Sequence, residues 1–476
     1  MRTRWLFVCA GVVAAAIWGP APARGEVADW PGLYDPFQIL DLQVTMEPAD
    51  LAVIRADETF DIEKPAWLSV PGETPVLVSI RRKSGDPIGG KLSYKVDINE
   101  YVDGQRWHGV RKLSLENGDD QDVVSEGFAW FLQQQAATLD NGYAPGMANW
   151  ANLTINGAAQ GLYVNVEQVD ESFLKNRNLW VSHETWLYKQ SDISHPTIKE
   201  QPADPTLINT TMEALNYSPF DPDSPVPTPD PATLAAQLRQ YIHMDTMLSL
   251  GAVEAVTDGG DSLFSHGKNF YWADYVNDKR RYFPWDLDAA IRSTTADVYD
   301  RGRYAYDEII LNNPTIRLQY DRLLLDLVDG PLAPEELMAF LDQIEPVLTP
   351  ALQADPNSKV GGDVAGHFDS LRQWAIDRMA NVRWQVLADM PVPGDANRDG
   401  TVGIADLSAL ADHYGAAGAT WEQGDFNGDG IVGIADLSTL ADNYGHPGAA
   451  AVPEPAALGL LAAGALALLL RRRRRR

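Results

Sequence analysis

The chain has 476 residues, of which 45% are hydrophobic, and a formal net charge of −28. This length favours one large domain with smaller pieces around it, and the apolar content is high enough for a folded protein. Binding to nucleic acid or anionic lipid requires basic patches, so the acidity excludes these partners for the folded part and favours cations such as calcium. The single cysteine, Cys9, lies in the N-terminal apolar segment, so we expect neither a disulfide nor thiol redox chemistry.

The first 25 residues have the pattern of a secretory signal peptide. Arg2 and Arg4 precede an apolar stretch from Trp5 to Trp18, and small residues follow around Ala23 and Gly25. We expect this segment to direct export and to be cleaved. An uncleaved membrane anchor is the alternative.

Residues 29–387 mix strand-like and helix-like runs without a regular βαβ alternation, which predicts an α+β domain. The runs "PVLVSIRRK" and "LSYKVDI" have strand patterns, whereas "SEGFAWFLQQQAATL" and "TIRLQYDRLLLDLV" have helical ones. A Pro/Asp-rich stretch at 218–234 predicts a surface loop, and "PVP" at 391–393 predicts a hinge.

Within this domain, residues suited to chemistry recur in chain order. The strand-like "KLSYKVDINEY" has Lys91 and Lys95 toward its ends, and Glu126 lies near the start of the next helix. The run "ANLTINGAAQGLYVNVEQVDESFL" predicts a hairpin that turns at Asn156 and Gly157. An acid-plus-Asn loop, "VTDGGDSLFSHGKNFYWADY", and an acid-x-acid motif, "FPWDLDAAI", follow. Phosphoryl transfer requires such a set, because it needs a lysine held by an acid and Asp and Asn oxygens on Mg²⁺.

On these motifs the chain resembles the CotH kinase-like family, which has an atypical protein-kinase fold. The most specific parts are "INGAAQGLYVNVEQVDESFL", "KNFYWAD" and "FPWDLD". The resemblance implies ATP and Mg²⁺ or Mn²⁺ as cofactors. It also implies roles for matching positions: Lys95, or alternatively Lys91, on the phosphates; Glu126 to orient that lysine; Val166, Glu167 and Gln168 as the adenine hinge; Asp258, or alternatively Asp261, as catalytic acid or base; Asn269, Asp286 and Asp288 as metal ligands.

Other interpretations of these residues stay open. Lys95 can be a solvated strand residue, and Glu126 a first-turn acid favoured by the helix dipole. Asp286 and Asp288 on a strand would point to one face, where a cation would separate them, or they would cap a following helix. Ser125 stands where the family commonly has Arg, just before the acid at 126.

Three functions therefore compete. The first is a secreted or surface kinase that phosphorylates Ser or Thr hydroxyls of envelope or matrix proteins; the acceptor is unknown. The second is a non-catalytic scaffold or binding protein that keeps the kinase-like fold. The third, a carbohydrate-active enzyme with a pair of carboxylates, has no motif support.

Residues 394–445 contain a tandem repeat. The run "GDANRDGTVGIADLSALADHYG" recurs 30 residues later as "GDFNGDGIVGIADLSTLADNYG". Each copy has calcium-loop spacing, with oxygen ligands at loop positions 1, 3, 5, 7 and 12 and a glycine at position 6. The expected Ca²⁺ ligands are Asp395, Asn397, Asp399, Thr401 and Asp406 in the first loop, and Asp425, Asn427, Asp429, Ile431 and Asp436 in the second.

Position 12 is Asp in both loops instead of the usual Glu, and an amphipathic helix follows. With the duplication, this resembles a type I dockerin, a small all-α calcium-binding module. Dockerins pair with cohesins, so the resemblance implies a cohesin-like partner. A calcium-stapled spacer is the alternative.

The chain ends in Val-Pro-Glu-Pro, an apolar run from Ala456 to Leu470 and six arginines. The run is shorter than the roughly 20 residues that span a bilayer, and the arginines favour the cytoplasmic side. Residues 452–476 resemble the PEP-CTERM sorting signal of Gram-negative bacteria, which implies a sorting protease of the exosortase type. We expect an exported protein in the outer envelope, at the cell surface or outside, with membrane contact through this segment before processing. A permanent tail anchor is the alternative.

Overall fold

The computed structural model describes residues 30–83, 85–190, 196–204, 206–216, 231–299 and 311–445. The expected signal peptide and sorting signal lie outside these residues. Most of the expected Pro/Asp-rich loop also lies outside them, and its last four residues open helix α6. None of the described helices combines the length and the apolar character needed to cross a membrane.

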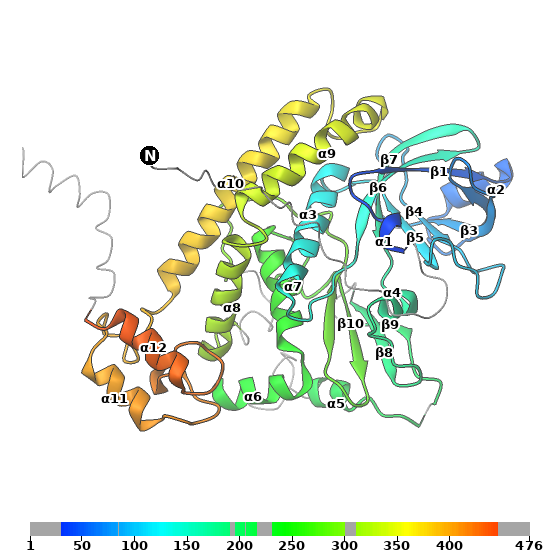
Figure 1. The fold of residues 1–476 in the computed structure, drawn as a ribbon. Helices are drawn as coiled ribbons and strands as arrows, with labels where there is room; N and C mark the ends of the chain where they lie inside the picture. The colour runs from blue at the N-terminus through cyan, green and yellow to red at the C-terminus, as the bar shows by residue number, and fades with distance from the viewer. Residues whose placement is uncertain are drawn as a thin grey trace, which may run out of the picture.

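The N-terminal part folds into a closed seven-stranded barrel (Figure 1). Neighbouring strands follow the order β1-β2-β3-β4-β5-β7-β6 and are antiparallel, except that β6 and β1 close the barrel in parallel. The strands are β1 (Ile39–Thr45), β2 (Lys64–Ser69), β3 (Val76–Arg82), β4 (Tyr94–Asp97), β5 (Lys112–Glu116), β6 (Ala148–Ile155) and β7 (Ala158–Glu167). Two helices, α1 (Trp30–Leu33) and α2 (Pro48–Ala56), accompany them.

The predicted hairpin is confirmed in β6 and β7. Asn156 and Gly157 connect the strands and have φ angles of 51° and 78°. A two-residue turn with positive φ at both positions matches the twist of an antiparallel pair, and Asn-Gly suits it because both residues tolerate this region. The hairpin strands then bury apolar residues inside the barrel, including Leu153 and Tyr163.

A second, four-stranded sheet lies beside the barrel in the order β11-β10-β8-β9. Its strands are β8 (Thr185–Gln190), β9 (Thr197–Glu200), β10 (Phe270–Tyr275) and β11 (Arg281–Pro284). The helices around it are α3 (Val123–Ala136), η1 (Ala137–Leu139), α4 (Glu171–Asn176), α5 (Thr210–Asn216), α6 (Pro231–Tyr241), α7 (Met244–Val256), α8 (Pro314–Val328), α9 (Pro334–Ala354) and α10 (Val364–Asp389). The mixed α+β character predicted from the sequence is therefore present.

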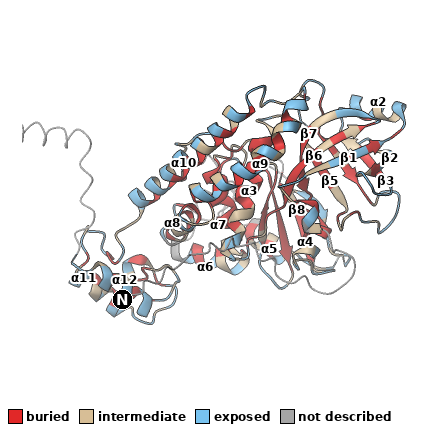
Figure 2. Ribbon diagram, turned by 45° about the horizontal axis from the view of Figure 1, so that its top comes forward, coloured by how far each residue is buried: buried red, intermediate tan, exposed pale blue. Residues whose placement is uncertain are grey.

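Helix α3 packs on β6 and β7 of the barrel and on α7, which in turn packs on β11 of the second sheet. Asp122 caps α3, and its Oδ1 accepts hydrogen bonds from the backbone N–H groups of Val124 (2.8 Å) and Ser125 (2.9 Å). One side of helix α10 packs against α8 and α9, whereas its outer side is exposed along much of its length (Figure 2).

The repeats form a small module with helices α11 (Ile404–Asp412) and α12 (Ile434–Asn443) and the short η3 (Trp421–Gln423). The segment that joins the two repeats runs beside the second repeat loop, because the Gly418 N–H donates to the Gly430 carbonyl at 2.7 Å. The module packs on α8: Leu318 joins its core beside Phe426, and Arg322 donates to the Phe426 carbonyl. In Figure 1 it lies at the end of α10, beside α8.

Candidate active site

A cavity of about 340 Å³ lies between the barrel and the second sheet. Its lining contains six basic side chains and three acidic ones. In a protein with a formal net charge of −28, this local excess of positive charge favours an anionic ligand. The lining residues are Phe60, Asp61, Arg81, Lys83, Lys95, Lys112, Gln168, Val169, Asp170, Lys189, Lys199, Glu200, Tyr271 and Trp285.

Strand alternation produces the barrel wall of this cavity. Arg81 pairs in register with Lys95, and Lys95 pairs with Ser114, so these side chains lie on one face of β3, β4 and β5. Their neighbours Ile80 and Val96 point inward and are fully buried in the barrel core. Because apolar residues point into the barrel and polar residues point out of it, Arg81 and Lys95 lie side by side along the cavity.

Lys83, directly after β3, lies among acidic residues. Its Nζ forms an ion pair with Glu116 and donates to Ser114 Oγ at 2.9 Å. Burial alone would lower the pKa of Lys83, but Glu116 and Asp286 raise it above its ordinary value, with a smaller effect from Glu126. The lysine is therefore a firmly charged cation at this end of the cavity.

Glu126, in the first turn of α3, faces the same group. Its side chain is 1% exposed, and among the described residues neither carboxylate oxygen has a hydrogen-bond partner. Burial, then Glu116, Asp288 and Asp286, raise the pKa of Glu126 well above its ordinary value. A buried carboxylate without donors is costly unless a cation or proton compensates it.

Asp286 and Asp288 complete an acid cluster, which we define as Glu116, Glu126, Asp286 and Asp288. Burial raises the pKa of Asp286, and burial and then Asp286 raise the pKa of Asp288 to about 8. The two acids follow β11 and do not lie on it, and Asp286 has a left-handed φ of 59°. The predicted strand position is therefore wrong. Neither acid caps a helix in the described residues, where the next helix after them is α8.

Two further loops meet this segment. The Asn269 carbonyl accepts from the Trp285 N–H at 3.2 Å, and the Gly260 N–H donates to the Ala289 carbonyl at 3.0 Å. Asp258 Oδ2 accepts from the Ser293 N–H at 3.0 Å. The backbone bonds bring the loops that hold Asp258 and Asn269 to the acid-x-acid segment.

Asp258, Asn269 and Asp286 share an uncommon backbone conformation. Their φ angles are 53°, 61° and 59°. Side chains other than glycine seldom adopt this region, and such strained positions concentrate at functional sites. This shared feature of three separate loops supports a functional role for the place where they meet.

The buried Arg378 of α10 holds one of these loops from behind. Its guanidinium donates to the carbonyls of Ala255 (2.8 Å), Val256 (2.8 Å) and Ala296 (2.7 Å). These carbonyls flank Asp258 and the Ser293 segment bonded to it. Arg378 therefore fixes the end of α7 against the loop that follows the acid cluster.

The opposite wall comes from the second sheet. Lys189 of β8 lies over the Trp285 ring at 5.2 Å from its centroid and near Tyr271 of β10 at 5.9 Å. Lys83 lies over the same Trp285 ring at 5.4 Å. The indole beside Asp286 is thus contacted by cations from both walls.

The predicted lysines lie in different places. Lys95 lines the cavity, and burial, followed by the charges of Lys112 and Arg81, lowers its pKa to about 7. Lys91 precedes β4, so its predicted place on that strand is wrong. Its Nζ is buried and forms an ion pair with Asp355 at 3.0 Å, away from the cavity lining.

The predicted hinge lies at the end of β7. Val166 is buried in the strand, and the Glu167 carboxylate pairs with Arg177 at 2.6 Å and accepts from the Trp30 indole N–H at 2.7 Å. Gln168 lines the cavity and donates to the Tyr271 hydroxyl at 2.9 Å. Of the three residues, only Gln168 belongs to the cavity lining.

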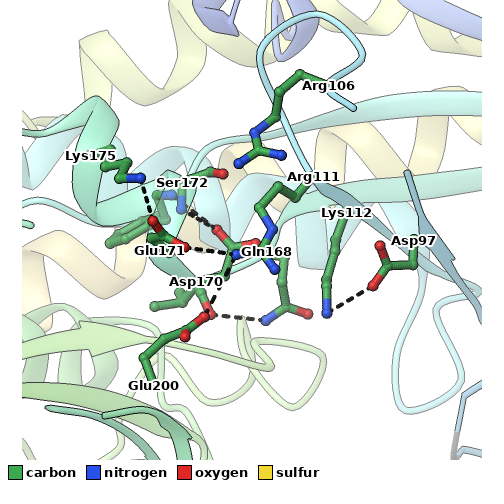
Figure 3. A network of polar contacts seen from close by, with 12 residues as sticks. Asp97, Arg106, Arg111, Lys112, Gln168, Asp170, Glu171, Ser172, Lys175 and Glu200 are labelled. Carbon is green, nitrogen blue, oxygen red and sulfur yellow. Dashed lines mark hydrogen bonds and ion pairs between the residues drawn. The ribbon is translucent and has the colours of Figure 1, made fainter. Parts of the chain in front are cut away.

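A polar network surrounds the predicted adenine hinge (Figure 3). Lys112 pairs with Asp97 at 2.9 Å, and Arg111 pairs with Glu171 at 3.1 Å and with Glu200 at 3.8 Å. Asp170 caps α4 and accepts from the Ser172 N–H at 2.7 Å. These pairs tie the barrel edge to α4 and β9.

Asp261, the alternative to Asp258, is paired elsewhere. It forms ion pairs with Lys268 at 2.7 Å and with His266 at 3.6 Å. Its carboxylate is about one-third exposed. Only Asp258 is bonded to the segment that follows the acid cluster.

In the first repeat loop, the carboxylates accept hydrogen bonds from backbone N–H groups of the same loop. Asp406 accepts from the Gly403 N–H at 2.7 Å and the Asn397 N–H at 3.2 Å, and Asp395 accepts from the Gly400 N–H at 2.8 Å. Asp399 accepts from the Thr401 N–H at 2.9 Å.

The second loop repeats these contacts. Asp436 accepts from the Gly433 N–H at 2.8 Å and the Asn427 N–H at 2.9 Å, and Asp429 accepts from the Ile431 N–H at 2.8 Å. One oxygen of Asp425, Oδ1, is buried and has no described partner. Across the described ranges, no three His, Cys, Asp or Glu side chains are grouped so as to hold a metal ion.

Sequence reasoning missed Lys83, Glu116, Lys189 and Trp285. Lys83 and Glu116 each continue an alternating strand, so the period-2 pattern of "PVLVSIRRK" and "KLSLE" could have placed both on the polar face. Lys189 stands in a strand whose neighbours are buried, and a charged residue in such a run was the available signal.

A family model described as CotH kinase protein matches residues 88–382, and a PEP-CTERM protein-sorting motif matches residues 451–475. Among solved structures, the chain is similar to the proinflammatory kinase CtkA of Helicobacter pylori, with 10% identity and a TM-score of 0.32 over 68% of this chain and 91% of that one. No curated protein matches the chain. The first family match covers more than half of the chain, and the sorting motif indicates export to the cell envelope.

Proposed function

Because the chain belongs to the CotH kinase protein family, we propose that it is an exported atypical kinase that transfers phosphate from ATP to Ser or Thr hydroxyls of envelope or matrix proteins. One observation carries the proposal: Lys83, which lines the cationic cavity, lies beside the acid cluster. A cation beside several carboxylates is suited to hold phosphates together with their metal ion.

In this proposal the nucleotide lies in the cavity. Adenine contacts the hinge at Gln168 and Val169, and the phosphates extend toward Lys83, which takes the role that the sequence assigned to Lys95. Lys95 lies further along the same wall and adds positive charge. The Lys83–Glu116 pair supports this assignment, since an acid that orients the phosphate lysine is required.

Two carboxylates of the acid cluster, together with phosphate oxygens of the nucleotide, are suited to Mg²⁺ or Mn²⁺, which would neutralise charge on the phosphates. Asp286 and Asp288 would hold the metal, and Asn269, bonded through its backbone to the residue before Asp286, would assist. The unpartnered oxygens of Glu126 support the fit, because a cation nearby would compensate them. Asp258 would accept the proton of the acceptor hydroxyl.

We also propose that residues 394–445 are a calcium-binding, dockerin-like module that follows the kinase-like domain at 29–387. The duplicated loop contacts and the buried, unpartnered Oδ1 of Asp425 support a cation in the second loop. Ile404 and Ile434, at equivalent places in the repeats, are 72% and 71% exposed. These matched apolar residues are the surface that we assign to a cohesin-like partner.

The test is phosphate transfer by the full mature chain. The protein is incubated with γ-labelled ATP, Mg²⁺ or Mn²⁺ and a Ser/Thr-containing acceptor, beside the Lys83→Met variant. We expect label on the acceptor or on the chain itself, and a loss of orders of magnitude in the variant. Equal labelling by both proteins would contradict the role of Lys83, and no labelling by the wild type would favour the non-catalytic scaffold.

A further inference from the structure

Two lysines from opposite walls of the cavity share one indole. Lys83 follows β3 of the barrel and Lys189 lies on β8 of the second sheet, and their ammonium groups are 5.4 Å and 5.2 Å from the Trp285 ring centroid. Their nitrogen atoms are therefore separated by no more than the sum of these two distances. One extended chain of phosphates can contact both.

The two lysines differ in how their charge is compensated. Lys83 has Glu116 as its ion-pair partner. Lys189 has no carboxylate partner among the described residues, where its contacts are the two aromatic rings. Burial lowers the pKa of Lys189 to about 8, although the charge of Asp286 opposes this effect. An aromatic face compensates a cation only in part, so an anion would gain from pairing with Lys189.

Trp285 provides a fixed surface for both lysines. Its ring is 3% exposed and packs edge-on against Tyr271 at 5.3 Å. Its backbone N–H is bonded to Asn269, next to the acid cluster. The indole is therefore a fixed platform, and the two flexible lysine side chains are held over it beside the proposed metal ligands.

We propose that Lys83 and Lys189 grip the phosphate chain of the nucleotide from both walls over Trp285, so that the cavity selects triphosphates over shorter chains. This inference rests on the proposed function for the identity of the ligand, but the shared chemistry is that of any linear polyphosphate. Lys189 is a ligand-binding residue that gains its contact only when the phosphate chain is long enough to reach both sheets.

The experiment measures binding to the full chain by calorimetry with ATP, ADP and AMP, each with Mg²⁺, and with inorganic tripolyphosphate. The variant Lys189→Met removes the charge and keeps an unbranched side chain over the ring. The matched control is Lys279→Met, which removes an exposed charge from the same sheet, between β10 and β11, outside the cavity lining. Lys189→Arg tests rescue.

We expect Lys189→Met to lower the affinity for ATP and tripolyphosphate at least tenfold. The affinity for ADP should fall less, and that for AMP by less than twofold. Lys279→Met should change the affinity for each of the four ligands by less than threefold, and Lys189→Arg should restore most of the ATP affinity. Circular dichroism and melting of each variant confirm that the fold is retained.

We call the contact of both lysines with one phosphate chain the clamp. Three results show whether the clamp or the proposed function fails. The clamp is overturned if the wild type binds ATP and Lys189→Met either binds ATP equally well or loses affinity for ATP, ADP and AMP by the same factor. The kinase proposal then stands. If the wild type binds tripolyphosphate with the expected Lys189 dependence but not ATP, the clamp stands and the nucleotide assignment fails. If it binds none of the four, both fail.

Discussion

Glu126→Gln should change stability in opposite directions without and with the nucleotide. In the metal-free protein the buried carboxylate has no described partner, and burial and the neighbouring acids raise its pKa well above the ordinary value, which favours the form that carries a proton. Taking up that proton against an ordinary pKa of about 4.3 costs folding at most about 3–4 kcal/mol at pH 7. The neighbouring acids share this cost, so we expect the neutral, nearly isosteric Gln to stabilise the metal-free protein by about 1–3 kcal/mol.

The pH dependence has a defined sign. Because the pKa of Glu126 is raised, the folded state binds more protons than the unfolded state above pH 4.3 or so, and wild-type stability falls as pH rises through this range. Gln does not titrate. The advantage of the variant should therefore be present at pH 7–8 and disappear near pH 4.

Thermal melts in EDTA at pH 4.5, 7 and 8 provide the assay. A gain of about 1–3 kcal/mol corresponds to a rise of about 2–8 °C in Tm at pH 7. With saturating Mg-ATP the order should reverse, because Gln lacks the charge that a cation would compensate. The matched control is Glu336→Gln, an exposed acid in the first turn of α9. A Glu126→Gln protein that is less stable than the wild type in EDTA at pH 7 would refute this reasoning.

Three further predictions concern other parts of the chain. Replacing Arg378 with Met removes the donor of several buried carbonyls, so urea denaturation should show a loss of about 3–5 kcal/mol; a loss below about 1 kcal/mol contradicts this role. Calcium titration of the full chain should show two sites by calorimetry, one lost in Asp395→Ala and the other in Asp425→Ala, and absence of any calcium heat would refute the repeat assignment. Mass spectrometry of the protein from its native host should find a start near Arg24 or Glu26 and an end near Pro455, whereas intact terminal arginines would favour a tail anchor.

Local sequence patterns were sufficient to predict those elements whose structure depends on residues close to each other in the chain. The Asn156-Gly157 turn was predictable because its backbone requirement is local, and the helix that carries Glu126 because its cap and apolar pattern are contiguous. Asp286 was placed wrongly on a strand. The strand ends at Pro284, and the positive φ of Asp286 turns the chain away.

Long-range pairing decided the rest. Lys91 was a plausible phosphate ligand until its partner was known, and that partner, Asp355, is 264 residues away in the chain. Lys83 and Lys189 lie over one ring only because two separate sheets meet there. No periodicity within a single segment can indicate such a contact, since it depends on how the barrel packs against the second sheet.

The central claim is that the cavity binds a metal-nucleotide complex through the acid cluster. The most direct measurement is the Tm of the full chain with and without saturating Mg-ATP or Mn-ATP, for the wild type and for Asp286→Asn. We expect the wild type to gain stability, by about 2.7 kcal/mol when the ligand is at 100 times its Kd, and Asp286→Asn to gain much less while folding normally without ligand. A wild-type protein whose Tm does not change with either nucleotide complex would contradict the account and leave the non-catalytic scaffold.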